Sequence, residues 1–351
     1  MVALQLGCLR AELRDAGVFE TCEARSWAKL GVLGAVVAGC LIGLAHFGWI
    51  GVPVFVPLAG VCSTSIAMFG HEGSHRSFSR SPGRNALMCY LTFPLFGGLS
   101  SLYWRDKHDR KHHAHPNVEG LDPDIRPFPF ASSRGDHEAS GPAVRWFQRV
   151  FQRWLFWPMA TLMAIGMRRS SLLFLARTPG KRDRAWWIEA ACIAAHYTGW
   201  IVVPALVWGP LAAIGVYAAI WGFAGVCLAL VFAPAHMGLP IVRTANHDWE
   251  HQLATTRDLQ LPRAISFFFI GLDYQAEHHL FPRIPHQHLP EAARITRAWC
   301  QLNGVTHHSE PYLLGLAKAD RFMRDAWSKH AVDPEEALES SGDDVSTLAA
   351  T

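Results

Sequence analysis

Histidines in three clusters are the residues of this sequence whose types and spacing could do chemistry. The first cluster is an HxxxH pair, the second an HxxxHH run and the third a QxxHH run. Their members are His71, His75, His108, His112, His113, Gln275, His278 and His279. Imidazole suits iron, copper, nickel and zinc, and seven histidine ligands exceed what one such ion holds. The clusters therefore predict a site with two metal ions.

The number and type of the ligands distinguish a zinc site from a redox-active iron site. Structural zinc takes four protein ligands and catalytic zinc usually three plus a water, so zinc does not explain the number of histidines. A bundle-type di-iron site depends on glutamates and two Glu-x-x-His motifs, whereas these clusters are built of histidine. Redox-active iron can use O2 to attack an unactivated C–H bond, for which side chains have no counterpart. We therefore predict two iron ions with O2 as co-substrate.

Two long charge-free blocks must position these clusters. Residues 30–70 and 190–242 contain no Asp, Glu, Lys or Arg, and a membrane-spanning helix needs about 20 apolar residues. Turn-forming residues at 48–53 and at Gly209-Pro210 divide each block in two. The sequence therefore predicts an all-α membrane protein with four transmembrane helices in two hairpins, at about 30–48, 52–70, 190–208 and 211–233.

Composition and charge agree with this fold class. Half of the 351 residues are hydrophobic and only 17% are charged, and the net charge of +3 gives no large basic surface for nucleic acid. The eight cysteines lack a CxxC pair and predict neither a disulfide framework nor a zinc ribbon. Basic residues flank the outer ends of both blocks, at Lys29, Arg76, Arg80, Arg84, Lys181, Arg182, Arg184 and Arg243. The positive-inside rule then predicts that both termini and the metal site are cytoplasmic.

Shorter segments complete the predicted organisation. The apolar stretches 85–104, 155–167 and 264–272 are expected to be re-entrant or to lie at the membrane surface, beside cytoplasmic helices that carry the site. Residues 1–29 lack the order of a cleaved signal and are predicted to form a cytoplasmic segment that stays in the mature protein. Residues 30–320 would form the membrane domain, and the acidic tail 333–351 is expected to be disordered.

From Gly31 to Tyr312 the sequence resembles the integral-membrane fatty acid desaturases. The resemblance rests on the three boxes in their order, and the QxxHH form with the run 271–282 is similar to the linoleoyl-CoA or front-end branch. It implies an O2-dependent enzyme that introduces a cis double bond into a long-chain acyl lipid or acyl thioester. It also implies an eighth ligand at the end of the fourth span, a position that His236 occupies.

The same resemblance implies an external electron donor. The front-end branch often carries a fused cytochrome b5 domain with a His-Pro-Gly-Gly motif, which this sequence lacks. Ferredoxin, or free cytochrome b5 with its reductase, is therefore the expected partner. A basic group could dock such an acidic protein; its members are Arg105, Lys107, Arg110, Lys111 and Arg126.

Further polar residues near the boxes are candidates to orient the ligands or to bind metal weakly. These are Gln275, His115, Glu72, Asp109, Glu277 and Asp273. The remaining histidine pairs lie outside the boxes and are expected to have hydrogen-bonded or solvated surface roles. They are His247 with His251, His286 with His288, and His307 with His308.

Three alternatives to a desaturase stay open at the level of sequence. A hydroxylase on the same scaffold would return oxygen to the substrate and give an alcohol in place of an alkene. A zinc-dependent membrane lipid hydrolase would act without O2. A metal or proton transporter should place ionisable residues within its spans, where the two blocks offer only His46 and His196 near their middles.

Overall fold

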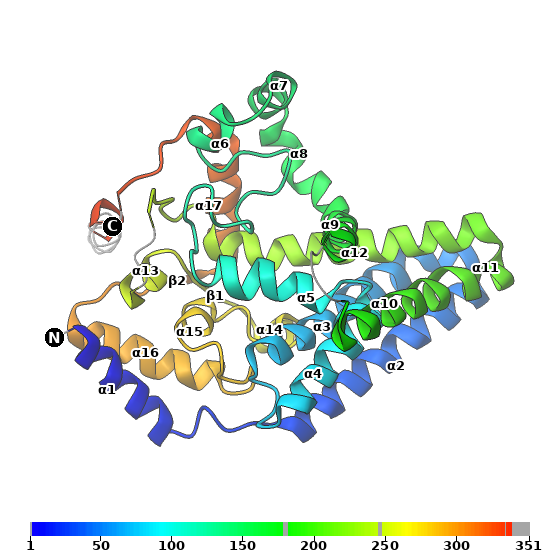
Figure 1. The fold of residues 1–351 in the computed structure, drawn as a ribbon, viewed down its shortest axis with the longest axis horizontal. Helices are drawn as coiled ribbons and strands as arrows, with labels where there is room; N and C mark the ends of the chain where they lie inside the picture. Colours follow the sequence, from blue (N-terminus) through cyan, green and yellow to red (C-terminus); the bar gives the residue numbers. More distant parts are fainter. Residues whose placement is uncertain (1, 178–181, 245–247, 334, 339–351) are drawn as a thin grey trace.

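The computed structural model describes residues 2–177, 182–244, 248–333 and 335–338, and its described part is mostly helical (Figure 1). The first hairpin consists of α2 (Glu23–Phe47), the 3-10 turn η1 (Gly48–Gly51) and α3 (Val52–His75). Gly48 has a φ of 57°, which a residue with a side chain rarely adopts, and so permits the turn. A Cβ on Gly43 would lie 2.5 Å from the Phe55 ring, so glycine is needed where the two helices meet.

The second hairpin returns the chain to the same end of the molecule. It consists of α10 (Arg184–Tyr197), η5 (Thr198–Val202), α11 (Val203–Trp208) and α12 (Pro210–His236). Gly209, with a φ of 83°, makes the reversal between α11 and α12. α12 packs along α3, where Gly60 leaves room for the ring of Phe223. As a result the C-terminal ends of α3 and α12 lie together.

The structure confirms the predicted fold class of an all-α membrane protein. Four helical stretches are long and apolar enough to cross a membrane by length and composition: Glu23–His75, Gln152–Arg177, Arg184–Trp208 and Pro210–His236. The first contains both α2 and α3. The second contains α8 (Gln152–Met159), η4 (Ala160–Leu162) and α9 (Met163–Arg177), so the region predicted to lie at the membrane surface also qualifies as a span by these criteria. The chain is a multi-pass membrane protein.

A sharply bent helix pair lies between the hairpins and carries the second histidine cluster. Its arms are α4 (Pro82–Tyr90) with η2 (Leu91–Phe96), and α5 (Ser101–Trp104) with the π-helix η3 (Arg105–His112). The arms bend by 111°, which is the geometry of a broken span or a re-entrant segment. This geometry is compatible with the re-entrant form predicted for 85–104.

Glu189 of α10 fixes the bend of this helix pair. Its carboxylate accepts hydrogen bonds from the backbone N–H groups of Ser101 at 3.0 Å and Leu102 at 3.2 Å. The hydroxyls of Ser100 and Ser101 donate to the same carboxylate. Because Glu189 is fully buried, this one side chain supplies the acceptors for the first turn of α5.

The remaining elements lie around the ends of α3 and α12, in the left half and at the top of Figure 1. They are α1 (Val2–Asp15), α6 (Arg134–Glu138), α7 (Pro142–Val150), α13 (Trp249–Ala254), β1 (Asp258–Gln260), α14 (Arg263–Phe269), α15 (Gln275–Leu280), α16 (Leu289–Asn303), β2 (Ser309–Pro311), α17 (Tyr312–Asp325) and η6 (Ala326–Ser328). Leu9 and Leu13 of α1 pack in one apolar cluster with Trp299 of α16. β1 pairs in parallel with β2 and contacts α15 from behind. Lys181 and most of the predicted tail lie outside the described residues.

Candidate metal centre

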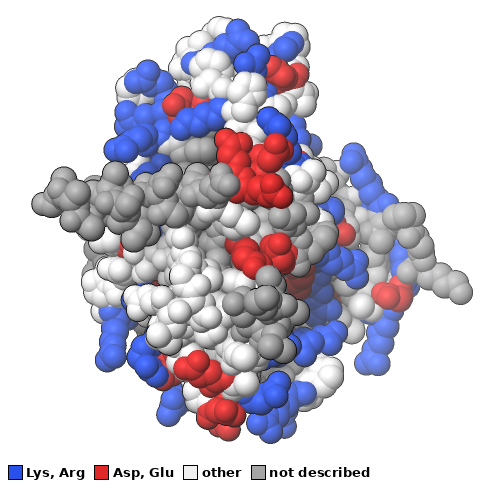
Figure 2. All heavy atoms as spheres, turned by 90° about the vertical axis from the view of Figure 1, so that its left-hand side faces the viewer, with Lys and Arg blue, Asp and Glu red and all other residues white. Residues whose placement is uncertain are grey.

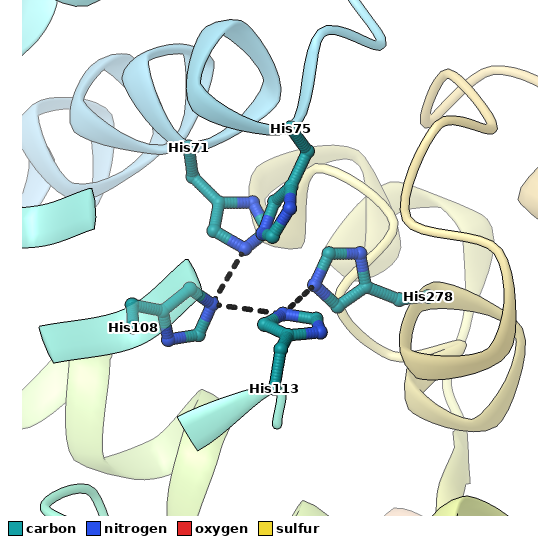
Figure 3. A group of neighbouring side chains, drawn as sticks. All are labelled: His71, His75, His108, His113 and His278. Atoms are coloured by element: carbon teal, nitrogen blue, oxygen red, sulfur yellow. Dashed lines mark hydrogen bonds between the residues drawn. The ribbon is translucent and has the colours of Figure 1, made fainter. Parts of the chain in front are cut away.

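Five histidines from three separate elements converge at the end of α3 (Figure 3). They are His71, His75, His108, His113 and His278, and one nitrogen of each lies within 4.8 Å of the others. The Nε2 atom of His108 is 3.0 Å from that of His71 and 3.2 Å from that of His113. His113 and His278 bring their Nε2 atoms to 3.1 Å. We call these five residues the five-histidine group.

A second group of three histidines adjoins the first. His112, His236 and His279 offer nitrogens within 4.8 Å of one another, and all three are buried. The rings of His113 and His279 stack with centroids 4.3 Å apart, which joins the two groups. We call this set the three-histidine group. All eight predicted ligands therefore lie in two adjacent groups, and His115 belongs to neither.

The π-helix η3 decides how the second box divides between the groups. An HxxxHH run in an α-helix would place His108 and His112 on one face, as residues i and i+4. In η3 the backbone N–H of His113 instead donates to the carbonyl of His108 at 3.0 Å, a bond between i and i+5. His108 and His113 consequently share the five-histidine group, and His112 joins the other. His108 and His112 still lie close enough to form a further group with Asp124.

Two aspartates that sequence reasoning missed hold the second box from behind. Asp122 accepts from His112 Nδ1 at 2.9 Å, and Asp124 accepts from His108 Nδ1 at 2.9 Å. A carboxylate on the far nitrogen fixes the tautomer and the ring orientation of a ligating histidine. The Asp-Pro-Asp run nine residues after His113 was the available signal. It is weak because nothing in the sequence shows the loop folding back onto η3.

Other groups anchor the Nδ1 atoms of the three-histidine group. His279 Nδ1 lies 3.0 Å from Gln252 Oε1, and His236 Nδ1 lies 3.0 Å from the carbonyl of Thr255. The Nε2 atoms of His112 and His279, like that of His75, are buried without a hydrogen-bond partner among the described residues. Buried polar atoms are nearly always satisfied. In His112 and His279 a hydrogen bond holds Nδ1, and Nε2 has no partner among the described residues. Such ring nitrogens are the donor atoms that a metal ion requires, so these residues fit iron.

Burial keeps these imidazoles in the form that binds metal. Desolvation lowers the pKa of His278 and of His279 well below its ordinary value. The neighbouring histidines lower each pKa further, because two positive rings repel. Both side chains are therefore neutral at physiological pH, and a neutral imidazole is the ligating species.

The polar residues predicted to orient ligands have different roles. Gln275 Nε2 lies 3.0 Å from His236 Nε2, beside the three-histidine group. Asp109 accepts from the Ser74 hydroxyl at 3.1 Å and lies 3.6 Å from His75 Nε2. Glu72 faces away from the histidine groups and accepts from His286 Nδ1 at 2.8 Å. Of these three residues, Gln275 and Asp109 lie beside predicted ligands.

Carboxylates behind the third box form a buried network. Glu277 Oε1 lies 2.9 Å from His307 Nε2, and Asp258 Oδ1 accepts from the backbone N–H of Ala276 at 3.0 Å. Asp273 accepts from the Ser266 hydroxyl at 2.6 Å. Burial raises the pKa of Glu277 to about 7. Through the bond from Ala276 to Asp258 this network supports the start of α15.

Several histidines expected at the surface are enclosed instead. The His307 side chain is 3% exposed and His286 is 8% exposed. His251 is also buried, with Nε2 2.9 Å from the carbonyl of Pro116. Their enclosure comes from elements distant in sequence, so spacing alone gave no sign of it. His247 lies outside the described residues.

An apolar cavity of about 1000 Å³ adjoins the three-histidine group. His112 and His236 line it together with Phe232 of α12. The facing wall is a stripe of α9 in which cavity-lining residues recur every three or four positions, at Met163, Met167, Ser170, Phe174 and Arg177. Apolar pockets with a few convergent polar groups are the usual form of small-molecule sites. The cavity can hold a long apolar chain beside the histidines.

Replacing Asp122 by asparagine should weaken metal binding while leaving the fold in place. The change keeps the size of the side chain but removes the negative charge of the carboxylate that accepts from His112 Nδ1. Loss of such a partner typically costs 10–100-fold in metal affinity, and we expect a weakening on the order of tenfold. Iron retention against increasing chelator measures it. Asp325→Asn, in an exposed pair with Lys329, is the control, and equal retention in both variants would contradict the orienting role.

Comparison with known proteins agrees with the histidine pattern. The model of the fatty acid desaturase family matches residues 26–311. The chain is 27% identical to an acyl-lipid (8-3)-desaturase of Thraustochytrium sp, over 73% of this chain and 59% of that protein. It is 30% identical to a chloroplastic acyl-lipid (7-3)-desaturase of Chlamydomonas reinhardtii, over 86% of this chain and 60% of that protein. This chain thus spans about three fifths of the length of these relatives.

Proposed function

Because this chain belongs to the fatty acid desaturase family, we propose that it is an O2-dependent fatty acyl desaturase that introduces a cis double bond into a long-chain acyl substrate. The observation that carries the proposal is the pair of histidine groups, eight imidazoles in all, beside an apolar cavity. Two iron ions held there would supply the oxidising chemistry that removes hydrogen from unactivated methylenes. Neither the hydroxylase nor the hydrolase alternative is favoured by any observation.

The chain's own residues would position the substrate and exclude water. Phe232, Met163 and Met167 line the cavity near His112 and His236, where an acyl chain would replace solvent. Asp122 and Asp124 hold the histidine rings in place, so little reorganisation is needed when a substrate binds. Which methylene lies beside the histidines would then determine the product, because proximity and orientation select the reacting bond.

Expression in a host lacking the product tests this function. Fed fatty acids should yield a new monounsaturated or more unsaturated acyl chain, with the double-bond position mapped by mass spectrometry. Product formation should require O2 and a competent electron donor. An alcohol in place of an alkene would support the hydroxylase, and product without O2 would overturn the proposal.

The finer placement within the family is also a proposal. We assign the chain to the front-end branch on its QxxHH box. We place the termini and the metal centre in the cytoplasm, on the basic flanks of the two blocks. Cys8 is exposed in α1. A membrane-impermeant thiol reagent should label it only in permeabilised cells, and labelling of intact cells would contradict the orientation.

The external electron donor would dock on a basic surface of the protein. Figure 2 shows lysine and arginine side chains toward the upper end of the molecule, where α6 and α7 lie in Figure 1, with acidic side chains below them. Three members of the predicted docking group already have carboxylate partners: Lys107 with Asp124, Lys111 with Asp106, and Arg126 with Asp136. Arg110 is exposed and is the best remaining candidate. If charge reversal at Arg110 left the rate of reduction by the electron donor unchanged, Arg110 would not belong to the docking site.

Gly166 offers a test of the cavity as the substrate site. It lines the cavity, and a Cβ added there would meet no atom within 4 Å. Gly166→Phe should therefore fill part of the acyl volume and lower turnover on the order of tenfold, with the iron content unchanged. Gly199→Phe is the matched control, because Gly199 also has open space but does not line the cavity. Equal turnover in both variants would argue against this cavity.

A further inference from the structure

The cavity beside the three-histidine group is lined by cations as well as by apolar side chains. Five basic residues contribute to its wall: Lys107, Lys111, Arg126, Arg169 and Arg177. The first three are paired with carboxylates, as described above. For Arg169 and Arg177 the described part of the chain provides no acidic partner. Two guanidinium groups are therefore available at the cavity.

Both arginines lie on the stretch of α9 that follows its apolar part. Met163 and Met167 come first along the helix, and Arg169, Leu173 and Arg177 follow at intervals of four residues. Residues at this spacing share one helix face. The wall of the cavity thus changes along α9 from apolar to cationic. Both arginines are exposed, so an incoming group can reach them.

The rim of the cavity is open to a lipid as well as to water. Phe128 is 83% exposed and Leu162 is 54% exposed, and both line the cavity. Large exposed apolar residues beside cations are typical of a surface that meets the head-group region of a bilayer. The arrangement matches an amphipathic ligand with an apolar chain and an anionic head.

We propose that Arg169 and Arg177 bind a phosphate group in the head of the acyl substrate. This rests on the proposed function, because it assumes that the cavity holds the acyl chain. Guanidinium groups bind phosphate through paired N–H donors, and two of them match a phosphate better than the single carboxylate of a free fatty acid. A membrane phospholipid and an acyl thioester of a phosphorylated carrier both present this chemistry.

Equilibrium binding to the full-length protein tests the proposal without turnover. The probes share one acyl chain: its coenzyme A thioester, its phosphatidylcholine in nanodiscs, its free acid and its neutral diacylglycerol. Arg169→Gln combined with Arg177→Gln is compared with wild type. Arg153→Gln combined with Arg184→Gln is the control, because these exposed arginines of α8 and α10 do not line the cavity.

The double variant at 169 and 177 should lose at least about tenfold in affinity for a phosphate-bearing probe. Its affinity for the free acid and the diacylglycerol should stay within about twofold, and the control should match wild type. Loss confined to the thioester identifies a soluble carrier, and loss confined to phosphatidylcholine identifies a membrane lipid. Unchanged affinity for both phosphate probes, or an equal loss for the neutral lipid, would overturn the proposal.

These outcomes are separate from those of the proposed function. A protein that discriminates phosphate in binding but forms no double bond would refute the desaturase and keep the phosphate site. If the protein forms double bonds and the double variant binds every probe like wild type, the desaturase is kept and the phosphate site is refuted. A change only in the rate of reduction by the donor would assign Arg169 and Arg177 to donor docking, and the proposal would be wrong.

Discussion

His112→Ala is expected to abolish desaturation and to remove one metal ion from each chain. His112 belongs to the three-histidine group, so its loss leaves only His236 and His279. Loss of a residue that merely orients a ligand costs 10–100-fold. Loss of a ligand from a group of three is therefore expected to cost on the order of 1000-fold in activity. Elemental analysis should show about one iron per chain in place of two.

His278→Ala provides the contrast between the two groups. His278 belongs to the five-histidine group, where four imidazoles remain after its loss. We expect this variant to lose desaturation as well, yet to retain more iron than His112→Ala under the same chelator. His46→Ala, at an exposed position outside both groups, should match wild type. Full activity and unchanged iron in both ligand variants would refute the metal assignment.

Glu189→Ala, a change in α10, is expected to destabilise the bent helix pair strongly. The substitution removes the acceptors of two backbone N–H groups and two hydroxyls at the start of α5. An unsatisfied buried donor costs about 1–3 kcal/mol. The backbone groups cannot turn away as hydroxyls do, so the loss is expected to be about 3 kcal/mol or more. Thermal unfolding of the detergent-solubilised protein measures this loss as a lower midpoint.

We expect Glu189→Ala to weaken the second box as well, although Glu189 binds the start of α5 and not the histidines. α5 continues directly into η3, so a disordered start of α5 should weaken iron retention by His108 and His112. Glu138→Ala, in an exposed pair with Arg134, is the control and should leave the unfolding midpoint unchanged. A variant at 189 that unfolds at the wild-type temperature would show that the serines find other acceptors.

The sequence by itself determined the fold class and predicted the candidate metal ligands. Charges are costly inside a bilayer, so the absence of charge in 30–70 and 190–242 is sufficient to predict two hairpins. Histidine spacing within each box is a local property, and each box follows an apolar segment that the same reasoning locates. Because these signals need no long-range contact, the amino-acid sequence alone was sufficient to name the seven histidines of the three boxes, whereas His236 was predicted only from the family resemblance.

Only the tertiary structure decided how those residues are arranged and supported. The π-helix η3 places His108 and His113 in the five-histidine group and His112 in the three-histidine group, and the spacing of the second box does not show this division. Asp122, Glu189 and the enclosure of His307 depend on partners between 10 and 89 residues away. A contact between distant segments has no local periodicity to signal it, since it forms only when the elements pack. The cavity that Arg169 and Arg177 line arises in the same way, from helices that meet only in the folded protein.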